Sequence, residues 1–106
     1  MARKRMPPKL NHVQVLILDI IRSHERVSGP EIREELEDYK EEKTGPNFYQ
    51  MMSRLEKSDL VAGEYGSFQW QGKFFRERFY KITFQGAEAL NTTWEFYANL
   101  MQPKSV

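Results

Sequence analysis

The sequence predicts a mainly α-helical domain with one small β-hairpin and a long helix at its end. Two observations predict this fold class. Apolar residues recur at helical spacing over most of the chain, and the spacing changes to that of strands shortly before the end. The chain has 106 residues, which suits one domain with a single hydrophobic core. Its 40% hydrophobic and 29% charged residues are typical of a folded globular chain.

The first helix is expected from about Asn11 to His24. Asn11 is a suitable N-cap residue. The apolar residues that share one face at spacings of 3, 4, 7 and 8 are Val13, Leu16, Ile17, Ile20 and Ile21. Val15 and Leu18 add a second apolar strip, so this helix is expected to be buried on more than one side. In a domain this small, a subunit interface would explain the second side.

A second helix is expected to open with a capping box from Ser28 to Glu31. Its core face is thin, with Ile32, Leu36 and Tyr39, and the remainder is acidic. Residues 31–43 hold seven acidic and three basic residues.

A third helix is expected after Thr44, with Pro46 in its first turn, and should end near Asp59. Its apolar face comprises Phe48, Met51, Met52 and Leu55. A second face, again at spacings of 3, 4 and 3, carries the polar and basic residues Asn47, Gln50, Arg54 and Lys57.

The period then becomes that of strands. Residues 60–65 and 73–83 are expected to form a hairpin whose turn lies within residues 66–72. Seven aromatic residues fall in this region: Tyr65, Phe68, Trp70, Phe74, Phe75, Phe79 and Tyr80. Tyr80 and Ile82 share one face of the second strand. Tyr80 is expected in the core, with Phe79 as a further candidate. The other aromatic residues could pack on the first helix, form a subunit contact or bind a partner.

The last helix is expected to follow Thr83 and to end at Pro103. Ala87, Leu90, Trp94, Tyr97 and Met101 are spaced 3, 4, 3 and 4, which is a short seam of the coiled-coil kind. Such a seam requires a partner, so we expect a dimer in which Leu90, Trp94, Tyr97 and Met101 form the interface.

Three helices followed by a two-stranded ribbon form the plan of a winged helix-turn-helix. In this plan the third helix enters the major groove of DNA and the ribbon lies along the backbone. We therefore divide the chain into a basic N-terminal arm (1–9), a winged helix-turn-helix domain (10–83) and a C-terminal dimerisation helix (84–102).

The sequence also resembles the PadR family of bacterial transcriptional regulators over about residues 10 to 90. The resemblance rests on Tyr49 with Met52, the triplet Arg54-Leu55-Glu56, the pair Leu60-Val61, and the run Arg78-Phe79-Tyr80-Lys81-Ile82-Thr83 followed by Gly86 and Ala89-Leu90. The sequence departs from the family pattern at Pro46-Asn47, Gln50 and Asp59. Its wing, residues 62–79, is longer and more aromatic than is usual in the family.

The resemblance implies a homodimer that binds a palindromic operator, usually as a repressor. It implies that the C-terminal helix packs with the first helix of the partner. It also implies release of DNA when a small, often aromatic molecule binds.

The residues expected to contact DNA are Asn47, Tyr49, Gln50, Arg54, Lys57, Lys73, Arg76 and Arg78. Asn and Gln pair with adenine, Arg pairs with guanine, and Lys binds phosphate. Alternatives to these DNA contacts stay open. The polar stripe on the third helix could be an ordinary solvent-exposed helix face. Arg54 could belong to a structural network of ion pairs, and Tyr49 could cover the edge of the core. Charged wing residues also protect an edge strand.

Trp94 and Tyr97 could line a pocket for a flat ligand between subunits, or could simply form the interface core. The basic arm with Arg3, Lys4 and Arg5 could follow a phosphate backbone or a minor groove, or it could be an ordinary disordered basic start.

Composition excludes several other functions. The chain lacks cysteine, which rules out disulfides, cysteine-based zinc sites and a thiol nucleophile. His12 and His24 are far apart, and neither a Ser/His/Asp arrangement nor a Gly-rich phosphate loop is present. We therefore expect no enzyme activity, metal or cofactor. The longest apolar run, Val15 to Leu18, is far too short to cross a membrane, and we expect a cytoplasmic protein.

The net charge of +1 keeps a second function open, because DNA-binding domains are often strongly basic. This alternative is a winged-helix protein–protein interaction module that uses its aromatic wing and acidic second helix as contact surfaces.

Overall fold

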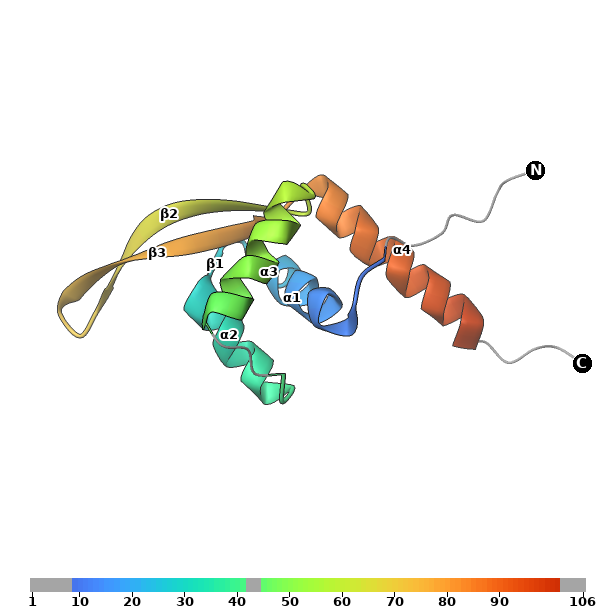
Figure 1. The fold of residues 1–106 in the computed structure, drawn as a ribbon, viewed down its shortest axis with the longest axis horizontal. Helices are drawn as coiled ribbons and strands as arrows, with labels where there is room; N and C mark the ends of the chain where they lie inside the picture. Colours follow the sequence, from blue (N-terminus) through green and yellow to red (C-terminus); the bar gives the residue numbers. More distant parts are fainter. Residues whose placement is uncertain (1–8, 42–44, 102–106) are drawn as a thin grey trace, which may run out of the picture.

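A computed structural model describes residues 9–41 and 45–101 of the chain. Its elements in chain order are α1 (His12–Arg22), β1 (Val27–Ser28), α2 (Gly29–Asp38), α3 (Gly45–Lys57), β2 (Val61–Trp70), β3 (Lys73–Ile82) and α4 (Phe84–Met101). The molecule is elongated, at 63 × 27 × 23 Å, because the hairpin and α4 leave the central helices in opposite directions (Figure 1). Residues 1–8 of the predicted arm, Thr44 and Pro103 lie outside the described residues.

β3 is the central strand of a three-stranded antiparallel sheet with the order β1-β3-β2. β2 and β3 pair along their whole length, from Val61 opposite Ile82 to Trp70 opposite Lys73. Gln71 and Gly72 join them with φ values of 50° and 75°, the left-handed pair that a two-residue hairpin turn requires. The hairpin is therefore longer than predicted, because the first strand does not end at residue 65. β1, which pairs Val27 with Tyr80, was not predicted.

α1 lies at the centre of the core and contacts α2, α4 and β3. Its buried residues are Val13, Ile17, Leu18, Ile20 and Ile21. Asn11 is the N-cap and forms a capping box with Gln14: the Asn11 side chain accepts from the Gln14 N–H at 2.8 Å, and the Gln14 side chain accepts from the Asn11 N–H at 3.0 Å. The predicted start of this helix is confirmed, and its end is Arg22.

α2 begins at the predicted cap, where the Ser28 hydroxyl accepts from the Glu31 N–H at 3.3 Å and donates to the Glu31 carboxylate at 2.9 Å. Ile32 and Leu36 are fully buried. The prediction that Tyr39 completes the core face is wrong, since its side chain is 56% exposed. The helix ends at Asp38, and Lys40 turns the chain with a left-handed φ of 58°, so Tyr39 leaves the apolar face.

α3 buries Phe48, Met52 and Leu55 as predicted, and Met51 is half-buried. Asp59 follows the helix with a φ of 58°. Aspartate adopts this left-handed conformation more readily than most residues, which explains how the chain turns here without a glycine.

α4 follows β3 with only Thr83 between them. The Thr83 hydroxyl accepts from the Gly86 N–H at 2.9 Å and donates to the Asp59 carbonyl at 2.6 Å. Leu90 is fully buried within this chain. The expectation that Leu90 faces water unless a second chain covers it is therefore wrong, because α1 and α4 already pack together around the common core.

These elements form the predicted winged helix-turn-helix with an additional C-terminal helix. Within the described segments, no helix combines the length and apolar character needed to span a membrane.

Candidate nucleic-acid interface

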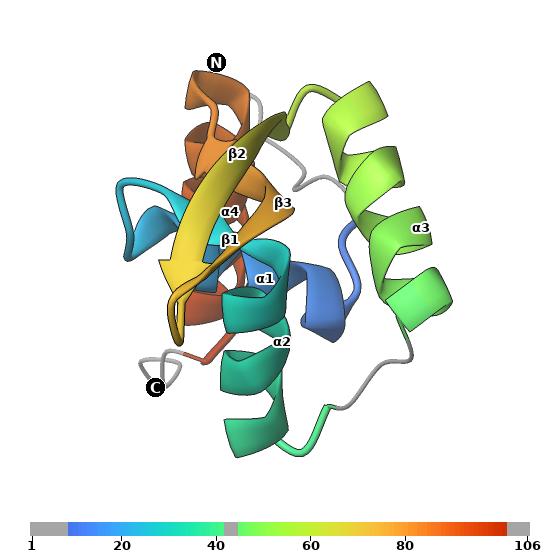
Figure 2. The same ribbon diagram turned by 90° about the vertical axis from the view of Figure 1, so that its left-hand side faces the viewer.

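A polar stripe follows the outer side of α3, which lies along one side of the molecule (Figure 2). Asn47, Gln50, Arg54 and Lys57 are all exposed. Within the described residues, none of these side chains has a hydrogen-bond or ion-pair partner. The amphipathic spacing of α3 explains this arrangement, because burial of Phe48, Met52 and Leu55 directs the opposite side outward.

The wing, formed by β2 and β3, has two different faces because alternate residues of a strand point in opposite directions. One face, which we call the α3-side face, carries Tyr65, Arg76 and Arg78. Tyr65 is 62% exposed and lies opposite Arg78 in the register. The guanidinium groups of Arg76 and Arg78 lie 4.8 and 4.9 Å from the Tyr65 ring centroid, so cationic and aromatic groups alternate on this face.

The opposite face of the wing holds a packed aromatic cluster. Phe68 stacks on Phe75 at 5.6 Å between ring centroids and meets Phe79 edge-on at 6.5 Å. The Arg26 guanidinium lies 3.8 Å from the Phe79 ring centroid and 3.5 Å from Glu64. A two-stranded hairpin is marginally stable by itself, and this cluster supports the wing from the Glu64–Phe79 pair near the core to the Phe68–Phe75 pair near the turn.

An ion pair joins α3 to the wing. Arg78 Nη2 donates to Glu56 Oε1 at 2.5 Å, and both side chains are less than one-third exposed. The same nitrogen lies 3.4 Å from the carbonyl oxygen of Gly63. The hydrogen bond to Glu56 raises the pKa of Arg78, which therefore stays charged.

A groove of about 520 Å³ runs between α3 and the α3-side face of the wing. Its lining residues are Tyr49, Ser53, Glu56, Tyr65, Arg76, Glu77, Arg78 and Tyr80. Tyr49 is half-buried, with its ring edge-on to Phe48 at 5.0 Å. Burial, together with the negative charge of Glu77, raises the pKa of Tyr49, so its hydroxyl remains a donor at neutral pH. Burial likewise raises the pKa of Tyr80.

The structure brings most of the predicted DNA-contact residues to one side of the molecule. Arg76, Arg78 and Tyr49 line the groove beside the stripe on α3. Lys73 is exposed but lies beside the turn at the far end of the wing, away from the groove. Glu56 and Tyr65 were not predicted as site residues. Glu56 stood in the Arg-Leu-Glu triplet, but its partner is 22 residues away and spacing alone could not identify it.

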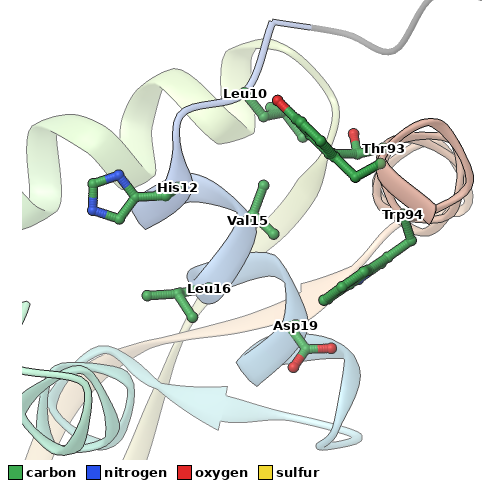
Figure 3. Close-up of a pocket in the computed structure, with 8 residues that line it drawn as sticks. Leu10, His12, Val15, Leu16, Asp19, Thr93 and Trp94 are labelled. Carbon is green, nitrogen blue, oxygen red and sulfur yellow. The ribbon is translucent and has the colours of Figure 1, made fainter. Parts of the chain in front are cut away.

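A second cavity, of about 430 Å³, lies between α1 and α4 (Figure 3). It is lined by Leu10, His12, Val15, Leu16, Asp19, Thr93, Trp94 and Tyr97. Figure 3 shows the Trp94 ring extending from α4 toward the helix that carries Asp19. Both members of the predicted ligand pocket, Trp94 and Tyr97, therefore line one cavity, and each is about half exposed. No cluster of metal-ligating side chains occurs among residues 9–41 and 45–101.

No protein-family model and no curated protein sequence matches the chain. Solved structures do match it. A PadR family transcription regulator from Clostridium difficile R20291 is 23% identical with a TM-score of 0.67, over 86% of this chain and 95% of that chain. RosR from H. salinarum is 23% identical with a TM-score of 0.70, over 92% of this chain and 82% of that one.

Bacillus subtilis PadR, solved in complex with operator DNA, is 16% identical with a TM-score of 0.63. The alignment covers 91% of this chain and 50% of that chain. At these identities the likeness establishes the fold, which is the PadR-like winged helix with a C-terminal helix.

Proposed function

We propose that this chain is a PadR-type transcriptional regulator, acting in the cytoplasm as a repressor, that binds palindromic duplex DNA as a homodimer. The observation that carries the proposal is the stripe on α3. Asn47, Gln50, Arg54 and Lys57 are exposed together and lack partners among the described residues. A helix of a winged helix-turn-helix with this composition suits the major groove.

Each residue of the interface has a distinct role in this proposal. Asn47 and Gln50 read adenine, Arg54 reads guanine, and Lys57 binds phosphate. Tyr49, whose hydroxyl stays protonated, donates to a phosphate at the edge of the groove. On the wing, Arg76 and Lys73 contact the backbone or the adjacent minor groove, and Arg78 belongs to the same surface with its guanidinium held by Glu56.

The proposed dimer contact is the exposed apolar side of α4. Trp94, Tyr97, Leu100 and Met101 are each more than half exposed in a single chain. Apolar side chains that cluster in this way mark an interaction surface. A two-fold dimer would present two copies of α3, which accounts for a palindromic operator.

The cavity between α1 and α4 supports a small aromatic effector as a further partner. Its walls are mostly apolar, and Trp94 and Tyr97 offer ring faces for stacking. Because Trp94 and Tyr97 also belong to the proposed dimer contact, a ligand bound there would alter the relative position of the two chains.

The domain division follows from these roles. Residues 10–83 form the DNA-binding unit, residues 84–102 form the dimerisation helix, and the basic arm of residues 1–9 follows the phosphate backbone beside it.

Selection of bound sequences from a random duplex pool tests the proposal. We expect enrichment of one palindrome, with affinity that falls steeply between low and moderate salt because phosphate contacts release counterions. If no duplex is retained even at low salt, the proposal fails. The alternative function, a protein–protein interaction module, would then be favoured. Phe74 of the wing, which is 77% exposed, supports that alternative.

A further inference from the structure

The ion pair between Glu56 and Arg78 is placed where α3 and the wing meet. Glu56 lies in the last turn of α3, and Arg78 lies on β3, in the part of the wing nearest the core. α3 approaches the wing through β2, and the Arg78 guanidinium reaches across β2, within 3.4 Å of the Gly63 carbonyl, to the Glu56 carboxylate. One contact therefore connects all three elements.

Gly63 has no side chain, and the ion pair between Glu56 and Arg78 occupies the space that a side chain would fill. A Cβ atom added at Gly63 would overlap the Glu56 carboxylate and would lie 3.0 Å from Arg78 Nη2. The backbone of Gly63 does not require glycine for its φ, since its φ is not in the left-handed range. The small residue is thus explained by the passage of the ion pair over the strand.

The charges around the ion pair also favour a contact that holds α3 and the wing together. The carboxylate of Glu56 faces the groove that the proposed function assigns to DNA, where an uncompensated negative charge would repel phosphate. Arg78 neutralises this charge. The Tyr65 ring, 4.9 Å from the guanidinium, covers Arg78 on the wing.

We propose that the Glu56–Arg78 pair is a positioning contact that fixes the angle between the reading helix α3 and the wing. This inference rests on the proposed function, in which α3 and the wing contact DNA together. Arg78 then acts through Glu56 and not by binding phosphate, and Arg76 is the arginine of the wing that contacts the backbone.

Distance measurements between spin labels test the proposal on the free protein. The chain has no cysteine, so Pro46→Cys and Gln69→Cys provide unique labels at the far ends of α3 and the wing, both at exposed positions. Dilution with unlabelled protein restricts the measured distances to those within one chain. We expect one narrow distance distribution in this labelled parent.

Three variants should broaden that distribution to about twice its width. Phe79 and Tyr80 still hold the base of the wing in the core, but the rest of a two-stranded hairpin is only marginally ordered without a further contact, hence the roughly twofold broadening. Glu56→Gln and Arg78→Gln each remove one charge of the ion pair. Gly63→Ala displaces the carboxylate without changing any charge. The double variant Glu56→Gln/Arg78→Gln should be no broader than either single variant, since the two residues act as one unit.

Glu64→Gln is the matched control. Glu64 is next to Gly63 on β2 but pairs with Arg26 on the other face, so its neutralisation should leave the distribution unchanged. Circular dichroism verifies that each variant is folded. If Glu56→Gln and Gly63→Ala both keep the parent distribution, the pair does not position the wing and the proposal is wrong, even if both variants melt at a lower temperature.

Hydroxyl-radical footprinting on the duplex enriched from the random pool supplies the second readout. In Glu56→Gln, protection under α3 should persist while protection under the wing is lost. In contrast, a direct phosphate contact by Arg78 predicts that Glu56→Gln keeps the wing footprint, which would overturn the proposal. Absence of any bound duplex would refute the proposed function, and the spin-label distances would still decide whether the pair positions the wing.

Discussion

Arg54 and Arg78 belong to the same face of the molecule but differ in their surroundings. Arg54 is exposed on α3, and no described residue pairs with it. Arg78 is mostly covered and bonded to Glu56. An exposed arginine without a partner is free to pair with a guanine edge, whereas a paired one must first give up its carboxylate.

The environment of Arg54 gives a first prediction. Arg54→Ala should weaken binding of the selected duplex by about 1–3 kcal/mol and relax the preference at one base pair. Its effect on the free energy of unfolding should stay within about 0.5 kcal/mol, because the side chain is exposed. Fluorescence titration with matched and mismatched duplexes, together with urea unfolding, measures both quantities.

Lys57→Ala is the control for sequence readout. It should weaken all duplexes alike and lower the salt slope by about one unit per half-site, because a phosphate contact carries no sequence information. Should Arg54→Ala unfold the domain while residual DNA binding persists, Arg54 is a structural residue and the assignment to base readout is wrong.

Tyr80 gives a prediction about alkaline stability. Burial raises the pKa of Tyr80 above its ordinary value of 10.0. Above pH 10 the unfolded chain releases this proton while the folded chain retains it, so rising pH favours unfolding. The free energy of unfolding should therefore fall by up to about 1.4 kcal/mol per pH unit for this group.

Urea unfolding between pH 8 and pH 11, a range set about the ordinary tyrosine pKa, detects the effect. Tyr80→Phe should reduce the alkaline loss of stability. Equal alkaline slopes for the parent and Tyr80→Phe would refute the assignment.

At the level of elements, the wing depends on contacts from outside the hairpin. Arg26, in the segment before β1, covers the Phe79 ring on the face that looks away from α3. Gly66 lies directly beneath the Arg26 side chain. A Cβ atom added at Gly66 would overlap Arg26 and lie 2.9 Å from the Phe79 ring. The aromatic content of the wing thus has a structural component on one face and an exposed component, Tyr65 and Phe74, on the other.

Arg26→Ala should lower the free energy of unfolding by about 1–2 kcal/mol, because it removes a cation–π contact and an ion pair. Glu64→Gln removes only the exposed ion pair and should cost less than about 1 kcal/mol. Urea unfolding compares the two. Equal losses for Glu64→Gln and Arg26→Ala would show that the ion pair, and not the stacking on Phe79, supports the wing.

The same elements explain what the sequence could and could not predict. Periodicity located the helices and the stripe on α3, because burial of one helical face is a local property. β1 has two residues, both buried, and so shows no alternation. Gly66 resembles a turn signal, yet it lies within a strand, where Arg26 and Phe79 occupy the space that a side chain would need. The Glu56–Arg78 pair depends on packing between distant segments, which spacing does not encode.

At the level of the whole molecule, the side chains of α4 lie in two different environments. Leu90 and Thr93 are buried within the chain, whereas Trp94, Tyr97 and Met101 are exposed. Only the exposed group is available to a second copy, so the predicted seam begins one turn later than its spacing suggested.

This division predicts different outcomes for two substitutions in α4. Leu90→Ala should lower the free energy of unfolding by about 2–5 kcal/mol, as for a buried leucine. Trp94→Ala should leave the fold intact and weaken the dimer by at least about 2 kcal/mol, which is roughly 30-fold in the dissociation constant.

Sedimentation equilibrium at micromolar concentration measures the dimer. Phe84→Ala provides the control, since Phe84 is 74% exposed at the other end of α4 and lies outside the proposed contact. A parent protein that remains monomeric at this concentration would contradict the proposed dimer.

Thr83 connects the two ends of this elongated molecule. It is the single residue between β3 and α4, and its hydroxyl also binds the chain that follows α3. Gly86 in the first turn of α4 lies so close to the Leu60 carbonyl that a side chain could not fit there. In the proposed dimer, α4, β3 and the end of α3 would thus rotate as one lever. A few degrees of rotation at the dimer contact would change the separation of the two reading helices, so in the proposed dimer a contact away from the DNA would set the operator spacing.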